Sequence, residues 1–403
     1  MRLDYLPYLI GCLVALADSA SDIYAPSLPA ISEYFHTTEK VTALTMSINL
    51  IGIAFSGLIY GPLSDYYGRR PILLISWSGF VFGSILSLFA HSIEYLIIFR
   101  FIQGLGGGAA FVIGISTLRD VFDSEKYSKI LSKIGMIVAL SPGIGPIVGS
   151  IIADKYDWKA VFLLVTISGI IGLIALFFLL PETNKKNVIE RVFVKNIIKT
   201  YLKLVINPYY FGFIFLKIAT LFWLWGELGN LPFIFINGMG LDVGYYGYFF
   251  AFGVVIYTLG TIFNQRFVSY LGITRMLNLG VALTIISSVI LIIGNILANM
   301  NPWAFQICKI PAAFGIALIF GNATTKALST VGKDTGAAAA LMAAFEMIVG
   351  SIGIMVVSKF YDGTTLPLAI VMLLSSISAA IVLYFLQKFP KDESNEPKPV
   401  LTN

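Results

Sequence analysis

The chain is built from apolar runs of about 20 residues that alternate with short polar segments. A helix needs about 20 apolar residues to cross the hydrocarbon core of a bilayer. Twelve such runs occur, at about 6–29, 41–60, 72–90, 95–117, 130–152, 159–180, 209–230, 243–262, 276–297, 303–326, 336–357 and 366–386. Charged residues make up only 12% of the 403, whereas a soluble domain carries about 25%. We therefore predict an all-α polytopic membrane protein with twelve transmembrane helices.

A basic segment at about 182–207 is the only long interior loop, and it divides the runs into six and six. The segment Gly68-Arg69-Arg70 has a weak counterpart in Gly272–Arg275, about 204 residues later. We predict two six-helix bundles at 1–183 and 208–387, a basic cytoplasmic linker at 184–207 and a disordered cytoplasmic tail at 388–403. Parallel halves joined in this way favour a transporter with a substrate site near the bilayer midplane.

The segment Gly61–Pro71 lies between two long apolar runs, and we interpret it as a tight hairpin at a membrane surface. Clustered Arg and Lys in short loops mark the cytoplasmic side. With twelve spans, both termini share the side of this hairpin, and most other basic loop residues fall there too. We predict a bacterial cytoplasmic (inner) membrane. The net charge of +5 is spread over many loops, so it does not indicate nucleic-acid binding.

The hairpin has features that a gate would need. Asp65 can accept hydrogen bonds from a helix N-terminus or from Arg69, which would hold the hairpin when the cytoplasmic side is shut. Gly61 and Gly68 permit close approach and unusual backbone angles. The alternative is that Arg69 and Arg70 only orient the hairpin in the membrane.

Two acids, Asp18 and Asp22, lie four residues apart in the first run, so they share a helix face. Carboxylates at this spacing repel each other, and one of them can then hold a proton at neutral pH. A proton-coupled carrier needs this chemistry, and ionisable residues inside a membrane are functional by default. The alternative is that Asp22 lies solvated near the outer mouth, where Ser19 and Ser21 supply hydrogen bonds.

Arg100 lies a few residues inside the fourth run and is followed by Gln103. An arginine at the centre of a membrane helix costs at least ~2.5 kcal/mol on insertion scales, so we expect it to face a cavity or a partner. Alternatively, its long side chain reaches the outer interface.

The second half also contains charges within its apolar runs. Glu227 follows Trp223 and Trp225, two rings that can hold an apolar or cationic ligand. The alternative is an aromatic belt at the outer interface. Glu346 lies in the eleventh run, and two bases, Lys217 and Lys309, complete the set. A Lys–carboxylate pair across the halves is either structural or part of the transport path.

Small residues recur in the fifth run, where Gly143, Gly145, Pro146 and Gly149 allow bending and close helix packing. We expect Cys12 and Cys308 to pack in the apolar runs. His36 and His91 fall at outer loops, where we expect solvated side chains. No phosphate-binding loop occurs, which disfavours transport driven by ATP; we predict no cofactor and no metal, with the proton gradient as energy source.

Five segments resemble signatures of a known family. Gly61–Arg70 resembles the loop between helices two and three of the major facilitator superfamily, and Arg100–Gly104 resembles its fourth-helix arginine motif. Gly143–Gly149 resembles its fifth-helix antiporter motif, with Ser150 where a final glycine is usual. Pro181–Thr183 resembles the end of span six. Asp22–Pro29 is similar to the bicyclomycin-resistance (Bcr/CflA) branch of drug:proton antiporters. The match covers nearly the whole chain, strongly in the first half and loosely in the second.

The resemblance implies the major facilitator fold and a carrier that is not an enzyme. We expect proton-coupled export of small amphipathic compounds, including drugs, by a monomer in the bilayer that alternates access. Proton coupling is expected of Asp22, Arg100, Asp18 and Glu227, a substrate cavity at Tyr24, Gln103, Trp223, Trp225 and Glu346, and gating by Gly61, Asp65, Gly68, Arg69, Arg70, Gly145, Pro146 and Gly149. The rivals are a proton-coupled carrier dedicated to one metabolite or siderophore (import or export), a channel and a receptor.

Overall fold

The computed structural model describes residues 3–184, 194–297 and 300–389, and every regular element in these ranges is helical. Residues 185–193, the first part of the predicted linker, and nearly all of the predicted tail lie outside the described residues. The elements are α1 (Leu6–Asp22), η1 (Ala25–Ser27), α2 (Leu28–Tyr34), α3 (Glu39–Tyr67), α4 (Arg69–Leu88), α5 (Ile93–Gly107), α6 (Ala109–Val121), α7 (Ser124–Lys155), α8 (Trp158–Leu179), α9 (Val194–Ile206), α10 (Pro208–Pro232), η2 (Phe233–Gly238), α11 (Val243–Leu271), α12 (Ile273–Leu297), α13 (Pro302–Ser329), η3 (Gly332–Asp334), α14 (Thr335–Phe360) and α15 (Leu366–Lys388).

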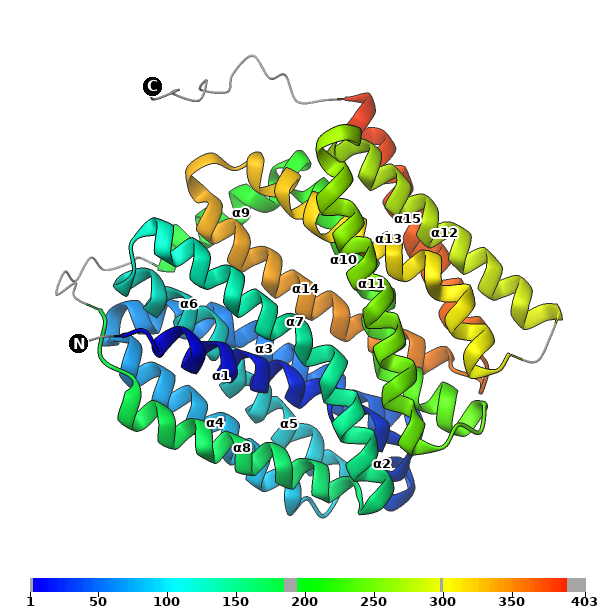
Figure 1. The fold of residues 1–403 in the computed structure, drawn as a ribbon, viewed down its shortest axis with the longest axis horizontal. Helices are drawn as coiled ribbons and strands as arrows, with labels where there is room; N and C mark the ends of the chain where they lie inside the picture. The colour runs from blue at the N-terminus through cyan, green and yellow to red at the C-terminus, as the bar shows by residue number, and fades with distance from the viewer. Residues whose placement is uncertain (1–2, 185–193, 298–299, 390–403) are drawn as a thin grey trace.

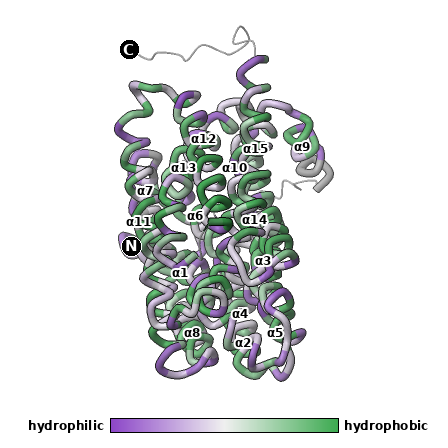
Figure 2. Tube along the Cα trace, turned by 90° about the vertical axis from the view of Figure 1, so that its right-hand side faces the viewer, coloured by the Kyte–Doolittle hydropathy of each residue, from purple (hydrophilic) through white to green (hydrophobic). Residues whose placement is uncertain are grey.

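The helical spans agree with the predicted apolar runs. Among the described residues, eleven helical segments are long and apolar enough to cross a membrane. The remaining predicted run, 130–152, lies inside α7, a 32-residue helix. Hydrophobic residues cover most of the helices, and hydrophilic residues gather in the connections at their ends (Figure 2). The chain is a multi-pass membrane protein, and the all-α prediction is confirmed.

The helices form two groups in chain order (Figure 1). In the first half, α1–α8, helix α3 packs on α5, α4 on α5 and α8, and α1 on α7. In the second half, α10–α15, helix α10 packs on α14, α15 and α13, and α12 packs on α13. Two long contacts, α3 with α14 and α7 with α11, join the halves.

The first span is a broken helix, unlike the continuous run predicted at 6–29. α1 ends at Asp22, and the chain continues through η1 and α2 to Tyr34. Pro26 lies inside η1 and Pro29 in the first turn of α2. Proline supplies no backbone N–H, so the α-helical hydrogen-bond ladder cannot run through these positions. The break leaves Asp22 and Tyr24 at an irregular stretch of backbone deep in the molecule.

The turn predicted at Gly61–Pro71 is much shorter in the structure, so the predicted length is wrong. α3 continues through Pro62 to Tyr67, α4 begins at Arg69, and Gly68 alone makes the turn with φ of 104°. Gly272 joins α11 to α12 in the same way with φ of 80°. Only glycine adopts such angles without steric cost. The two one-residue hairpins therefore reveal an internal repeat that the sequence showed only weakly.

Direct contacts between the halves lie toward the end of the molecule that carries α2, which we call the α2 end; the opposite end carries Gly68. Ser47 of α3 and Ser351 of α14 share a hydrogen bond of 2.7 Å between their hydroxyls. Near α2, Asn237 donates to Glu39 at 3.2 Å, and α2 packs on η2. The halves are thus joined at the α2 end.

The segment between the halves is partly helical. α9 (Val194–Ile206) lies within the predicted linker and packs on α10 and α14. Its 13 residues are too few to span a bilayer, so α9 does not change the number of crossings.

Candidate functional site

Arg100 lies at the centre of the first half with a side chain that is completely buried. Its Nη1 donates to the backbone carbonyl of Ala20 at 3.2 Å and to Oε1 of Gln103. Its guanidinium carbon lies 4.2 Å from the centre of the Tyr24 ring and 5.9 Å from that of Phe162. The side chain therefore does not reach the outer interface, and that alternative is excluded. Arg100 faces partners inside the bundle.

The partners of Arg100 are themselves held in place. Nε2 of Gln103 donates to the Ser84 hydroxyl at 2.7 Å. Asn49 of α3 donates to the backbone carbonyl of Arg100 at 2.8 Å and accepts from Ser21 at 2.7 Å. Because these residues come from α1, α3, α4 and α5, the polar cluster fixes four helices around one cation. Asn49 and Ser84 were not singled out from the sequence, where nothing distinguishes them from other polar residues in spans.

The Arg100 cluster leaves Tyr24 and Gln103 enclosed. Both side chains are about 1% exposed, and the Tyr24 hydroxyl shares a hydrogen bond with Thr45 at 3.0 Å. Tyr24 and Gln103 were expected to line a substrate cavity, but their side chains expose almost no surface. Both contact the guanidinium of Arg100 instead.

The two carboxylates of the first span lie in different surroundings. Asp18 is exposed although it sits in the middle of a spanning segment, whereas Asp22 is buried. Asp22 interacts electrostatically with both Asp18 and Arg100. In the described part of the chain the Asp22 carboxylate has no hydrogen-bond or ion-pair partner. An acid that is buried and unbonded can change its protonation without breaking a contact, and the exposed Asp18 lies one helical turn away.

The glycine-proline motif of the fifth span lies directly beside these acids. A Cβ on Gly149 would be 1.7 Å from the carbonyl oxygen of Ile23, and Gly145 also faces α1, 3.9 Å from the Asp22 Cβ. On the neighbouring side, a Cβ on Gly247 of α11 would be 2.6 Å from the carbonyl oxygen of Pro146. The motif thus brings α1, α7 and α11 into backbone contact at the α2 end.

The second half contains a buried ion pair between Glu227 of α10 and Lys309 of α13. The ammonium also lies 5.8 Å from the centre of the Trp223 ring and 5.6 Å from that of Phe305. Trp223 is 1% exposed, so it does not belong to an aromatic belt at the interface. Both members of this pair belong to the second half, so it does not cross the halves, a pairing that the sequence could not assign.

The ion pair repeats the arrangement of the first half. Lys309 follows Arg100 by 209 residues, and Glu227 follows Asp22 by 205. Arg100 is the eighth residue of α5, as Lys309 is of α13. Each half therefore contains, at corresponding positions, a buried acid and a base that lies over aromatic rings. The difference is that Glu227 and Lys309 bond each other, while Asp22 and Arg100 do not.

A second ion pair joins Lys217 of α10 to Glu346 of α14 at 2.6 Å, again within one half. Phe320 lies 5.5 Å from its ammonium. Both charged side chains are partly exposed, at 14% and 15%. This pair lies closer than Glu227 to the Gly68 end, because Lys217 is ten residues before Glu227 on α10.

Two aromatic residues lie where the halves meet. Trp225 is partly buried and packs on the hydrophobic core of the first half. Tyr246 of α11 is completely buried, and its hydroxyl has no hydrogen-bond partner among the described residues. Tyr246 interacts electrostatically with both Asp22 and Glu227. It therefore lies near an acid of each half, a position that the sequence did not indicate.

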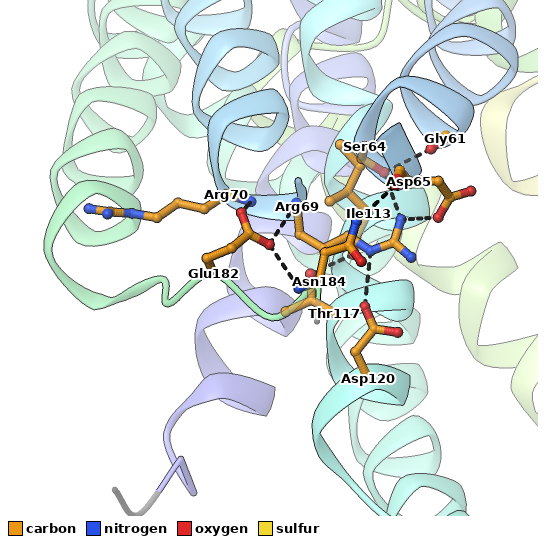
Figure 3. A network of polar contacts seen from close by, with 10 residues as sticks. All are labelled: Gly61, Ser64, Asp65, Arg69, Arg70, Ile113, Thr117, Asp120, Glu182 and Asn184. Carbon is orange, nitrogen blue, oxygen red and sulfur yellow. Dashed lines mark hydrogen bonds and ion pairs between the residues drawn. The ribbon is translucent and has the colours of Figure 1, made fainter. Parts of the chain in front are cut away.

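At the Gly68 end, charged side chains form a network around the one-residue hairpin (Figure 3). Arg69 pairs with Asp65 at 2.6 Å and with Asp120 at 3.0 Å. Glu182 accepts from the backbone N–H groups of Arg69 at 3.0 Å and Arg70 at 3.1 Å. An acid at this position stabilises the N-terminus of α4. The sequence predicted the bond between Asp65 and Arg69, but it did not predict Glu182 and Asp120 as partners.

Among the described residues, the partners of the Arg69 and Arg70 side chains belong to the first half. Arg70 donates to the carbonyl of Phe177 at 2.8 Å, and Asn184 donates to the carbonyl of Asp65 at 2.8 Å. The network therefore ties α3, α4, α6 and the end of α8 into one unit. Gly61 lies inside α3, 3.3 Å (measured from an added Cβ) from Val112 of α6.

The cysteine and histidine expectations have mixed outcomes. Cys12 is exposed, so its predicted packing role is wrong, and Cys308 is partly buried. His36 and His91 are exposed, as predicted. Within the described ranges, no group of three or more His, Cys, Asp or Glu side chains is placed to hold a metal ion.

Comparison with known sequences identifies the family. The model of the Major Facilitator Superfamily matches residues 9–357. A "Bicyclomycin resistance protein homolog" from Haemophilus influenzae is 27% identical over 387 residues, which cover 94% of each chain. "Multidrug resistance protein MdtL" from Vibrio parahaemolyticus is 27% identical over 396 residues, which cover 90% of this chain and 93% of the relative.

Comparison with solved structures gives the same fold. The peptide transporter POT in complex with sulfate superposes with a TM-score of 0.74 at 14% identity, over 95% of this chain and 94% of the other. The xylose transporter XylE from E. coli, in a partially occluded inward open conformation, gives a TM-score of 0.73 at 12% identity, over 98% and 99% of the two chains. The sequence match and the helical architecture agree, and the chain therefore belongs to the Major Facilitator Superfamily of transporters, with similarity to its bicyclomycin-resistance branch.

Proposed function

We propose that this transporter couples the inward movement of protons to the export of small amphipathic compounds, drugs among them, across a bacterial cytoplasmic membrane. In this proposal the monomer alternates access between its halves and takes its energy from the proton gradient without a cofactor. The names of the relatives, which refer to bicyclomycin and multidrug resistance, support this substrate class.

The observation that carries the proposal is the arrangement of Asp18, Asp22 and Arg100. A carboxylate without a bonded partner, buried in a membrane protein, gains stability by binding a proton. Arg100 opposes this because a nearby cation favours the charged form. Asp22 is therefore placed between opposing influences, and a change in its surroundings during the transport cycle can shift its protonation. Asp18, exposed and one turn away, provides a route for the proton.

The proposed orientation places the Gly68 end in the cytoplasm. Arg69, Arg70, Arg119 and Arg275 lie at this end, as the positive-inside rule requires for cytoplasmic loops. Since the direct contacts between the halves lie at the α2 end, we assign the described conformation to the state that is closed to the outside. Gly145, Pro146 and Gly149 would act in the outer closure, and the Arg69 network would hold the inner end of the first half.

Drug susceptibility of a host that lacks its own efflux pumps tests the proposal. Cells that carry the parent protein should tolerate higher concentrations of some amphipathic compounds than cells without it. Asp22→Asn, which keeps the size but cannot ionise, should reduce the protection to the level of cells without the protein. Asp154→Asn, at an exposed acid near the α2 end of α7, is the matched control and should keep the protection.

Proteoliposomes test the coupling directly. Substrate that moves out of the cytoplasmic compartment should drive protons in the opposite direction in the parent, and not in Asp22→Asn. Co-directional movement of proton and substrate would favour an importer of a metabolite or siderophore instead. Transport that continues unchanged in Asp22→Asn after the pH gradient is collapsed would contradict proton coupling through this residue.

A further inference from the structure

The ammonium of Lys309 occupies a site with the chemistry of a receptor for organic cations. It bonds the carboxylate of Glu227 and lies over the faces of Trp223 and Phe305. A carboxylate together with aromatic faces is the combination that binds quaternary ammonium ligands in proteins. Here a side chain of the protein itself fills that site.

The bonding of Lys309 differs from that of Arg100, its counterpart in the first half. Arg100 is fixed by Ala20 and Gln103 as well as by the ring of Tyr24. For the Lys309 ammonium, the described residues offer one hydrogen-bond partner, Glu227. A lysine chain has four rotatable bonds and can leave such a site without breaking further contacts.

Glu227 is also incompletely bonded. Its Oε2 is buried and has no hydrogen-bond partner among the described residues, and its side chain is 4% exposed. A buried oxygen of a carboxylate without a donor is costly, and a second cationic or donor group would remove that cost. The free oxygen therefore indicates that Glu227 can serve a ligand in addition to, or in place of, Lys309.

We propose that Glu227, Trp223 and Phe305 bind the cationic group of an amphipathic substrate, and that Lys309 is a tethered occupant which the substrate displaces. This inference rests on the proposed export function and deepens it, because it names organic monocations as a substrate class. Lys309 keeps the carboxylate neutralised when no substrate is bound, and a neutralised carboxylate is far less costly in a membrane.

The position of the site connects it to the acids of the first half. Tyr246, whose buried hydroxyl has no hydrogen-bond partner among the described residues, interacts electrostatically with both Glu227 and Asp22. The cation that enters beside Glu227 replaces the Lys309 ammonium, which stays attached to α13, so the protein gains one positive charge in this region, and that charge favours the ionised form of Asp22. Arrival of the substrate would thus promote release of the proton, as an antiporter requires.

The second ion pair is less suited to the role. The ammonium of Lys217 lies near one aromatic ring, that of Phe320, whereas the ammonium of Lys309 lies near two. A cation at Lys217 would therefore meet fewer aromatic faces, which are the groups that favour a quaternary ammonium ligand. Lys217 therefore supplies a matched control for Lys309.

The test is equilibrium binding of benzyltrimethylammonium to the purified full-length protein in nanodiscs, followed by tryptophan fluorescence and calorimetry. The parent should bind the probe, and Lys309→Ala should bind it about tenfold more tightly because the probe no longer competes with the internal ammonium. Lys309→Arg and Lys217→Ala should not tighten binding. Glu227→Gln should abolish binding, and Trp223→Phe should remove most of the fluorescence response.

The controls separate this inference from the proposed function. Neopentylbenzene, the uncharged isostere of the probe, should bind to the parent and to Glu227→Gln with the same affinity. If Lys309→Ala does not fold, the comparison of parent with Glu227→Gln still decides whether the carboxylate binds the cation. Failure of the parent to bind, or equal binding by parent and Glu227→Gln, would overturn the cation site. Neither result depends on transport, so proton-driven export would be judged separately by the susceptibility assay.

Discussion

Arg100 shows how a single side chain organises the first half. A buried guanidinium is costly unless other groups offset its loss of water. Nη1 donates to Gln103 and to the carbonyl of Ala20, and Tyr24 covers the planar face, whereas Nε and Nη2 are buried without a hydrogen-bond partner among the described residues. The guanidinium forms no ion pair with Asp22, although the two charges interact electrostatically.

Arg100→Lys should therefore fail although it keeps the charge. The lysine ammonium is a compact point charge, so it cannot stack flat on the Tyr24 ring or direct hydrogen bonds in the fixed planar pattern of a guanidinium. We expect the rate of substrate transport in proteoliposomes to fall about tenfold or more, equivalent to ~1.4 kcal/mol. Arg119→Lys, an exposed arginine of α6, is the control and should transport like the parent. Normal transport by Arg100→Lys would mean that only its charge matters.

At the residue scale, the sequence predicted which charged side chains are unusual but not which groups they contact. Asp18, Asp22, Arg100 and Glu227 stand out because charges are rare in apolar runs. The bond between Glu227 and Lys309 joins residues that are 82 positions apart. Nothing in a single sequence ranks that pairing above Glu227 with Lys217, so the structure was needed to find it.

At the element scale, glycines bring helices into backbone contact within each half. Gly149 of α7 packs against Ile23 in the first half. In the second half, Gly353 of α14 packs against Phe222 of α10, where a Cβ added to the glycine would lie 1.9 Å from the Phe222 carbonyl oxygen. Side chains as small as hydrogen allow this approach, which strengthens helix packing in a membrane.

Gly149→Ala should lower the apparent Tm of the purified protein, because the added methyl group must push α1 away from α7. Overpacking of this kind costs about 1–3 kcal/mol. Gly143→Ala, on the same helix, is the control, since its Cβ would meet only Val254 at 3.6 Å. Thermal unfolding of both variants in one detergent makes the comparison, and equal Tm values would show that α7 does not pack this way in solution.

The elements themselves were largely predictable, since the length and hydropathy of each run define a membrane helix. The exceptions have local causes. Gly61 and Pro62 were interpreted as part of a turn, but α3 accommodates both and extends to Tyr67. Charged residues end an apolar run before they end a helix, because a helix can project beyond the bilayer. The break after Asp22 was missed although Pro26 and Pro29 signal it, because the run was judged by its length and hydropathy alone.

At the scale of the whole molecule, the one-residue hairpins at Gly68 and Gly272 and the paired acid–base sites recur at a spacing of about 204–209 residues in the two halves. The halves are held together through α3 with α14 and α7 with α11. These two seams are where alternating access would open the molecule.

A disulfide across the first seam should stop transport. The hydroxyl oxygens of Ser47 and Ser351 are 2.7 Å apart, so sulfur atoms at the same positions are within reach of a bond. In a background with Cys12→Ser and Cys308→Ser, the double variant Ser47→Cys/Ser351→Cys should lose transport under oxidation and regain it with reductant. Each single cysteine variant should be insensitive. Full transport by the oxidised, cross-linked protein would show that the α2 end need not open.

The charged network around Arg69 has a consequence for how the molecule moves. Among the described residues, all of the groups that neutralise this guanidinium travel with it in the first half. A rigid-body rotation of that half would leave each of these bonds intact, so no unpaired charge would have to enter the hydrocarbon core of the membrane during the motion. The ion pairs of this network therefore need not break in such a motion, whereas the contacts of α3 with α14 and of α7 with α11 would have to change.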